Sequence, residues 1–176
     1  MDKLRITAVR LLFGLLWLAA AANPASAQEK VAPLKPRLIG TWVLADVYFD
    51  WQDGRKTQPY GPNVRGRLVL DTGDLFSFQI IGANRPKFKG SNRRDGTAEE
   101  NAIAVGQTES FFGTYSINEA DHTIAAQIDR AIFPNWDGTE RKYKIVLNDN
   151  EMRMVSPLNQ SAAGNYVPTL WWKRHK

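Results

Sequence analysis

Few side chains in this sequence could carry acid–base or metal chemistry. The 176 residues include two histidines, His122 in a turn sequence and His175 near the end, and no cysteine. Neither a Gly-X-Ser-X-Gly nucleophile motif nor a His-Glu-X-X-His zinc motif is present. We therefore predict no catalytic residue, no metal site and no cofactor. An enzyme here would need a buried carboxylate with a raised pKa, and the candidates are Asp46, Asp129 and Glu140.

A basic segment offers binding chemistry instead. Residues 85–94, RPKFKGSNRR, surround Phe88 with five cations: Arg85, Lys87, Lys89, Arg93 and Arg94. Such a run is typical of a solvated surface loop, and it also has the composition of a clamp for an anionic head group. Thr97 and Glu100 follow with the spacing of a capping box, which predicts a short helix beside this segment.

A second candidate segment is aromatic. The sequence FPNWDGT, residues 133–139, places Phe133 and Trp136 close to Asn135. It is either a turn with aromatic packing or the mouth of a pocket.

The rest of the chain must position these segments, and it consists of short alternating apolar and polar runs. Turn sequences such as Asp-Gly and Asp-Asn separate them, which indicates antiparallel hairpins. The expected strands are 39–50, 56–60, 65–71, 74–81, 111–118, 123–131, 139–148, 151–156 and 167–174. We predict an all-β fold, an antiparallel up-and-down barrel of 8 to 10 strands with one short helical insert, because closure removes exposed sheet edges. Residues 157–165 are expected to be an exposed loop.

Alternation also indicates which side chains face the interior. These are core residues in a filled barrel, or they line a cavity in a hollow one. Small residues at Gly113, Ala125 and Ala126 favour a cavity. On this interpretation the predicted ligand-binding residues are Phe76, Phe78, Arg85, Phe88, Tyr115, Phe133, Asn135, Trp136 and Tyr143.

The beginning of the sequence is typical of a secretory signal peptide. Basic residues precede an apolar run, and small residues follow at 25–27, so we predict a signal peptide over residues 1–27 with cleavage after Ala27. The apolar run is too short for a permanent membrane anchor. Residues 28–37 are expected to be a flexible leader and residues 38–176 the barrel domain. The protein is therefore predicted to be secreted or periplasmic, which, despite its formal charge of +5, argues against a nucleic-acid partner.

Several sequence segments resemble the lipocalins, and in particular the bacterial lipocalin-like domain proteins. The first is Gly-Thr-Trp at residues 40–42, and the others are YGPNVRGRLVLDTGDLFSFQI, RPKF, GTAEE, FFGTYSI, TIAAQI, FPNWDGTERKY and WWKR. The resemblance implies that Gly40, Trp42 and Arg174 close one end of the barrel, with the arginine stacked on the indole. The Thr-Asp-Tyr motif of many lipocalins is missing, and no helix is expected after the last strand.

The resemblance implies the architecture more directly than the ligand. The expected partner is one small apolar or amphipathic molecule, with an anionic head group as one form, held in the barrel interior. Two alternatives stay open: a shape-selective cyclase or isomerase acting on an apolar substrate, and a packed barrel with a purely structural or interaction role.

Overall fold

Strands joined by tight turns make up most of the described chain, which is residues 32–176 of a computed structural model. The predicted signal peptide and the first residues of the leader lie outside the described residues. The elements are α1 (Leu34–Leu38), β1 (Gly40–Trp51), β2 (Lys56–Thr57), β3 (Arg65–Leu70), β4 (Leu75–Ile81), η1 (Arg93–Asp95), α2 (Ala98–Gly106), β5 (Thr108–Asn118), β6 (Thr123–Ala131), η2 (Pro134–Trp136), β7 (Glu140–Leu147), β8 (Glu151–Val155), β9 (Asn159–Ser161) and β10 (Gly164–Arg174).

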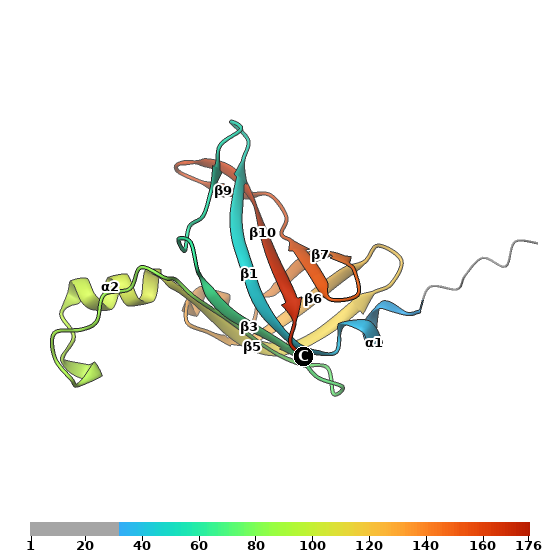
Figure 1. Cartoon of the computed structure of the whole chain (residues 1–176), viewed down its shortest axis with the longest axis horizontal. Helices are drawn as coiled ribbons and strands as arrows, with labels where there is room; N and C mark the ends of the chain where they lie inside the picture. Colours follow the sequence, from blue (N-terminus) through green and yellow to red (C-terminus); the bar gives the residue numbers. More distant parts are fainter. Residues whose placement is uncertain (1–31) are drawn as a thin grey trace, which may run out of the picture. The chain divides into compact units, whose positions relative to one another are not determined.

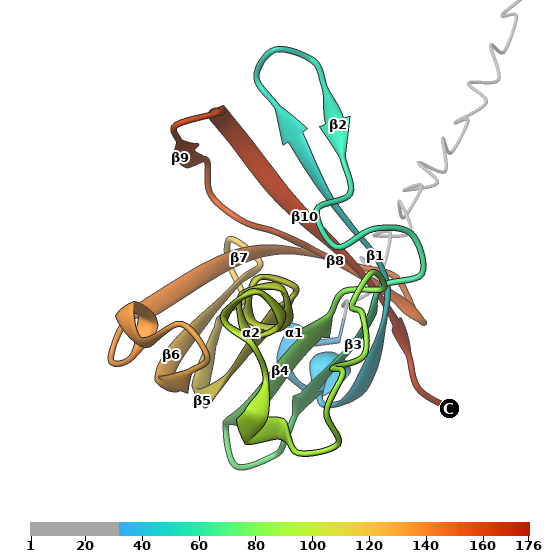
Figure 2. The ribbon, with the colours of Figure 1, turned by 90° about the vertical axis from the view of Figure 1, so that its left-hand side faces the viewer.

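Eight of the strands form a closed antiparallel barrel. The strand order is β2-β1-β3-β4-β5-β6-β7-β8-β10-β9, and an additional pairing between β1 and β10 closes the ring. That pairing runs from Trp42 opposite Arg174 to Trp51 opposite Tyr166. Figure 1 shows β1 and β10 side by side, and Figure 2 looks into the ring from the side of α2. The predicted up-and-down barrel is confirmed.

The two further strands extend the β1–β10 ribbon beyond the ring. β1 pairs with β3 through its first residues and with β2 only at Phe49 and Asp50. β9 pairs with the beginning of β10, at Gly164–Tyr166. The prediction of a loop over residues 157–165 is therefore wrong for residues 159–161, which form β9, and for residues 164–165, which begin β10. Gly164, with φ of 120°, permits this tight hairpin, whose polar sequence lacks the alternation that identified the other strands.

Alternate residues of each strand fill the barrel with a solid apolar core. In β4, Phe76, Phe78 and Ile80 are buried while Gln79 between them is exposed. The Phe78 ring stacks on that of Phe111 at 4.3 Å between centroids. It also meets the Trp172 ring edge to face at 5.5 Å. These ring contacts belong to a packed core, as expected for a protein interior.

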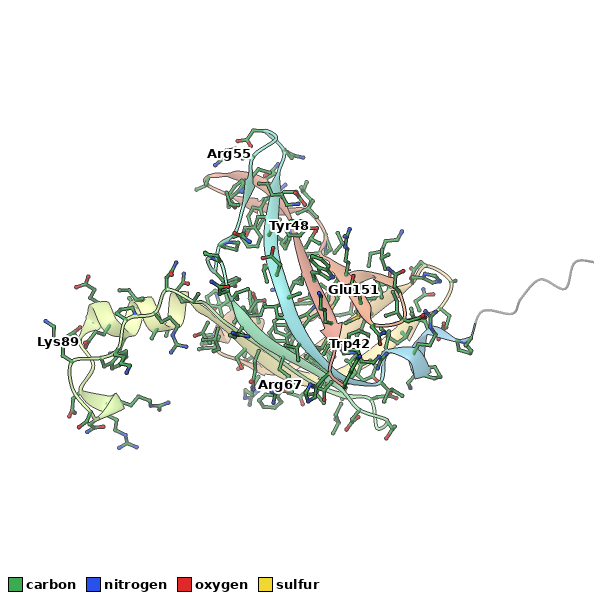
Figure 3. All side chains as sticks on the ribbon, viewed as in Figure 1. Trp42, Tyr48, Arg55, Arg67, Lys89 and Glu151 are labelled. Carbon is green, nitrogen blue, oxygen red and sulfur yellow. The ribbon has the colours of Figure 1, made fainter. Side chains whose placement is uncertain are left out.

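One end of the barrel is closed by Trp42, which is fully buried. Its Nε1 donates a hydrogen bond to the carbonyl oxygen of Leu38 at 2.8 Å. The Arg174 guanidinium lies 4.2 Å from the centre of its ring, and Arg174 also donates to the carbonyl oxygen of Ile39. Gly40 has φ of 129°, and a Cβ there would lie 3.2 Å from Arg174 Nη1, so glycine suits this position. Figure 3 shows Trp42 near α1.

The short helix α1 completes this closure. Leu34 and Leu38 are buried, and the Glu119 carboxylate accepts hydrogen bonds from the backbone N–H groups of Leu34 and Lys35. Packing against the barrel thus begins at Leu34, within residues 28–37, which we predicted to be a flexible leader.

The helical insert projects from the opposite end of the barrel from α1 (Figure 1). α2 begins with the predicted capping box: Thr97 Oγ1 accepts from Glu100 N–H at 3.2 Å, and Glu100 Oε2 accepts from Thr97 N–H at 2.8 Å. Lys89 lies at the far end of this arm (Figure 3). Across residues 32–176, the helices are too short or too polar to cross a membrane.

Candidate functional site

A cavity of about 340 Å³ lies between the barrel wall and the extended ribbon, toward the ends of β1 and β10 that are remote from Trp42. Its walls combine apolar, aromatic and polar side chains. They are Val47, Phe49, Pro59, Tyr60, Gly106, Glu109, Trp136, Arg141, Tyr143, Ser156, Asn159, Tyr166, Pro168 and Leu170. The volume falls in the range of small-molecule sites, which is about 300–1,000 Å³.

A carboxyl and a phenol meet at one side of this cavity. Tyr60 Oη donates a hydrogen bond to Glu109 Oε2 at 2.8 Å. Burial raises the pKa of the Glu109 carboxyl, against the opposing effects of the Tyr60 hydrogen bond and the Arg141 charge. The pKa of Tyr60 is raised as well, first by burial and then by the neighbouring carboxyl. The pair therefore keeps its protons to a higher pH than exposed groups would.

Arg141 lies at another side of the cavity. Its Nε donates to Tyr143 Oη at 3.1 Å, and its guanidinium lies 4.1 Å from the centre of the Trp136 ring. Burial raises the pKa of Tyr143 to about 12, although the Arg141 charge opposes this. Within residues 32–176, the two terminal nitrogens of Arg141 donate no hydrogen bond and form no ion pair. They remain available to a bound molecule.

Strand alternation explains why these charged residues point inward. In β7, Arg141 shares the face of the buried Tyr143 and Ile145. In β5, Glu109 shares the face of the buried Phe111. The alternation of inward and outward side chains therefore continues past the apolar residues of each strand to these charged ones. This continuation is the sequence signal for Glu109 and Arg141. The predicted strand began only at residue 111, so Glu109 lay outside it, and Arg141 was not among the predicted ligand-binding residues.

Tyr60 reaches the cavity from the connection between β2 and β3. Gly61, with φ of 73°, makes the turn after it. The Tyr60 carbonyl oxygen accepts a hydrogen bond from Ala83 N–H at 3.1 Å, which ties this connection to the end of β4. Tyr60 was not among the predicted ligand-binding residues, although its phenol lines the cavity.

Of the nine predicted ligand-binding residues, Trp136 and Tyr143 line the cavity. Phe76, Phe78 and Tyr115 do not, because they are buried in the solid part of the core. Tyr115 Oη donates instead to the carbonyl oxygen of Asp71 at 2.7 Å, in the turn between β3 and β4. In the structure these three residues belong to the core and do not line the cavity.

The other four predicted residues also lie outside the cavity. Arg85 and Phe88 line an open hollow of about 590 Å³ beside α2. Phe133 and Asn135 are exposed, and the Phe133 ring contacts the edge of Trp136 at 5.5 Å between centroids. The basic segment therefore lies on the projecting arm, and its cations do not reach the barrel cavity.

The three carboxylates named as candidate acids or bases lie outside the cavity, and the room expected beside Gly113 is absent. Asp129 and Glu140 are exposed, and Asp46 accepts hydrogen bonds from the Gln58 amide at the surface; Glu109 is the carboxylate that enters the cavity. The space expected beside Gly113 is filled, because a Cβ there would lie 2.0 Å from the Gln127 carbonyl oxygen. His122 and His175 are exposed. Residues 32–176 contain no cluster of three potential metal ligands.

Glu109→Gln is expected to flatten the dependence of stability on pH. Above the ordinary carboxyl value of about 4.5, Glu109 is ionised in the unfolded chain and still protonated in the folded one. The unfolded state then binds fewer protons, so stability falls as pH rises, until Glu109 also ionises in the folded protein. One proton gives a slope of at most about 1.4 kcal/mol per pH unit. Glutamine still accepts from Tyr60 but does not titrate.

The measurement is chemical unfolding of both proteins between pH 4 and pH 8. The difference in unfolding free energy, variant minus wild type, should grow with pH from pH 4.5 upward and then level off. A constant difference across this range would contradict the prediction. Exposed Glu140→Gln is the matched control, and it should give no such trend.

The closed eight-stranded ring, with a partly buried hollow at one end, defines a lipocalin-type barrel. The chain belongs to the lipocalin-like domain family, whose family model matches residues 39–175. No curated protein matches the sequence significantly.

Solved structures match the chain at low similarity. A lipocalin-like protein from Bacteroides uniformis is 15% identical, with a TM-score of 0.42 over 79% of this chain and 99% of that one. Bovine odorant-binding protein, in complex with a selenium-containing odorant, is 17% identical, with a TM-score of 0.39 over 81% of this chain and 73% of that one.

Proposed function

We propose that this protein binds one small amphipathic molecule in the cavity between the barrel and the β1–β10 ribbon. The observation that carries the proposal is the cavity itself, which is about 340 Å³ and joins apolar walls to a few convergent polar groups. Val47, Phe49 and Leu170 can bury an apolar body, while Glu109 and Arg141 can orient a polar end. A purely structural barrel would have no need of ionisable groups in such a hollow.

Trp136→Ala is expected to weaken binding of a lipophilic fluorophore such as 1-aminoanthracene by about tenfold. The indole forms part of the cavity wall, and a lost aromatic contact of this kind corresponds to roughly 1.4 kcal/mol. The measurement is fluorescence titration of the purified protein. Phe112→Ala is the control, because Phe112 is 51% exposed on the outer face of the barrel. The proposal fails if the wild type shows no saturable binding, or if both variants bind as well as the wild type does.

Native mass spectrometry of protein purified from its own host can then identify what the cavity holds. We expect a bound organic molecule that is released by solvent extraction. A carrier of this kind also fits the predicted export to the periplasm or beyond. Intact mass of the exported protein tests that step, since it should begin at Gln28 rather than at Met1.

A proton-transfer enzyme is the second candidate function, and the Glu109–Tyr60 pair is the observation that favours it. A carboxyl with a raised pKa can donate or accept a proton at a carbon next to a polar group. The extracted ligand, incubated with the protein in heavy water, would then gain deuterium in wild type and not in Glu109→Gln. Absence of exchange in the wild type would leave binding alone.

A further inference from the structure

We propose that Arg141 is the anchor of the ligand, and that the ligand is an organic monoanion with a carboxylate at one end of an apolar body. This inference rests on the proposed function, because it assigns the chemistry of the molecule in the same cavity. The anion is therefore expected at Arg141, the one arginine on the cavity wall, and not at the exposed cations of residues 85–94.

The first support is the unused donor capacity of Arg141. Nε is occupied by Tyr143 Oη, while the terminal nitrogens have no partner in the described part of the chain. A guanidinium presents its N–H groups in a planar fork that matches a carboxylate through two parallel hydrogen bonds. The side chain is half-buried, so an anion bound there would be partly removed from water, where a charge-assisted contact is strong.

The second support is preorganisation. The Trp136 ring lies 4.1 Å from the guanidinium on its face, and Tyr143 holds Nε on its edge. The ring and the phenol together restrain the Arg141 guanidinium before any ligand arrives. A fixed donor loses less conformational entropy on binding than a free surface arginine does.

The third support is the charge balance of the cavity. Arg141 and Glu109 are the two lining residues that can carry a full charge near neutral pH, and no atoms of the two lie within ion-pairing distance of each other. Glu109 faces Tyr60 as well as Arg141, and the raised pKa of its carboxyl keeps it neutral over a wider range of pH. The Arg141 charge is then left without a counter-ion from the cavity wall, and one carboxylate would neutralise it.

The other residues of the cavity wall indicate the chemistry of the rest of the ligand. Val47, Phe49, Pro168 and Leu170 offer apolar contact, and the volume of about 340 Å³ suits a bicyclic aromatic or a short aliphatic chain better than a long lipid. The single cation favours a monoanion over a phosphate dianion, which it would neutralise only in part.

The test compares two probes of one shape that differ in charge, 2-naphthoate and 2-naphthamide, by isothermal titration calorimetry. Wild type should bind the carboxylate more tightly. Arg141→Gln should weaken carboxylate binding by roughly ten- to hundredfold, while amide binding changes by less than about threefold. Arg141→Lys, which keeps the charge and loses the fork, should fall between wild type and Arg141→Gln.

Arg67→Gln is the matched control, because it removes the same charge from the outer face of β3 (Figure 3). It should leave both affinities unchanged, and thermal unfolding should show that every variant is folded. Equal losses for the two probes in Arg141→Gln, or no loss of carboxylate binding, would overturn the anchor and leave the carrier function standing. Failure of both probes to bind wild type would overturn both proposals.

Discussion

Replacing Trp42 by alanine is expected to lower the free energy of unfolding by about 3–5 kcal/mol. The side chain is fully buried, so its removal leaves a large hole at the closed end of the barrel. It also leaves the Leu38 carbonyl without its hydrogen bond and the Arg174 guanidinium without the ring beneath it. Small domains have only about 5–15 kcal/mol of stability, so this single change removes a large part of it. Urea unfolding of the two proteins measures the difference.

Trp171→Ala is the matched control for that substitution. Trp171 precedes Trp172 on β10 and is only partly buried, with Arg153 and Lys173 beside its ring. Trp171→Ala should lower the free energy of unfolding by well under half as much as Trp42→Ala does. Equal decreases for the two variants would contradict a special role for the buried indole. If Trp42→Ala does not fold, Trp42→Leu provides the measurement, because it removes the ring and keeps a large apolar side chain. In a double-mutant cycle with Arg174→Met, it should show a coupling of about 0.5–2 kcal/mol between ring and cation.

Gly113→Ala is expected to cost roughly 3 kcal/mol, an unusually large effect for one added methyl group. The β5–β6 pairing shifts register between Phe112 and Gly113, so β6 carries an extra residue at this point. A Cβ on Gly113 would lie 2.0 Å from the Gln127 carbonyl oxygen and 2.9 Å from Asp129 N. Both are backbone atoms and cannot move aside as a flexible side chain would.

Gly106→Ala serves as the control for Gly113→Ala. Gly106 is the last residue of α2, and a Cβ there would meet nothing within 4 Å. Alanine at this position should be neutral or stabilising by up to about 1 kcal/mol, because it restricts the unfolded chain. Thermal or urea unfolding compares the two variants. A small effect of Gly113→Ala would mean that the bulge adjusts easily, which would contradict the tight packing described above.

The fold was largely predictable from local patterns. Alternation in residues such as Phe76, Phe78 and Ile80, together with the turn sequences, predicted the eight barrel strands, but not the inward face of β1, which is apolar on both sides. The capping box at Thr97 and Glu100 predicted the start of α2. β9 was missed because its hairpin has a polar sequence with no alternation, and α1 because a helix of five residues depends on its contacts with the barrel.

The site was much less predictable, because a cavity is what remains after all the side chains have packed. The sequence indicates that Phe78 and Tyr143 both face inward, but it cannot indicate that one lies in the solid half and the other beside a hollow. The Glu109–Tyr60 contact joins residues 49 positions apart, and it depends on the course of the β2–β3 connection. Inward-facing charged residues at the ends of strands, such as Glu109 and Arg141, were the available signal.

The pairing of β1 with β10 also determines when, during synthesis, the barrel can close. β10 is synthesised after every other barrel strand, and it supplies both Arg174 at the closed end and Leu170 and Tyr166 at the hollow. While translation is still short of this strand, β1 and β8 must wait with unpaired edges, open to association with other chains. On the proposed function, the nascent polypeptide therefore cannot bind its ligand until β10 has joined the barrel.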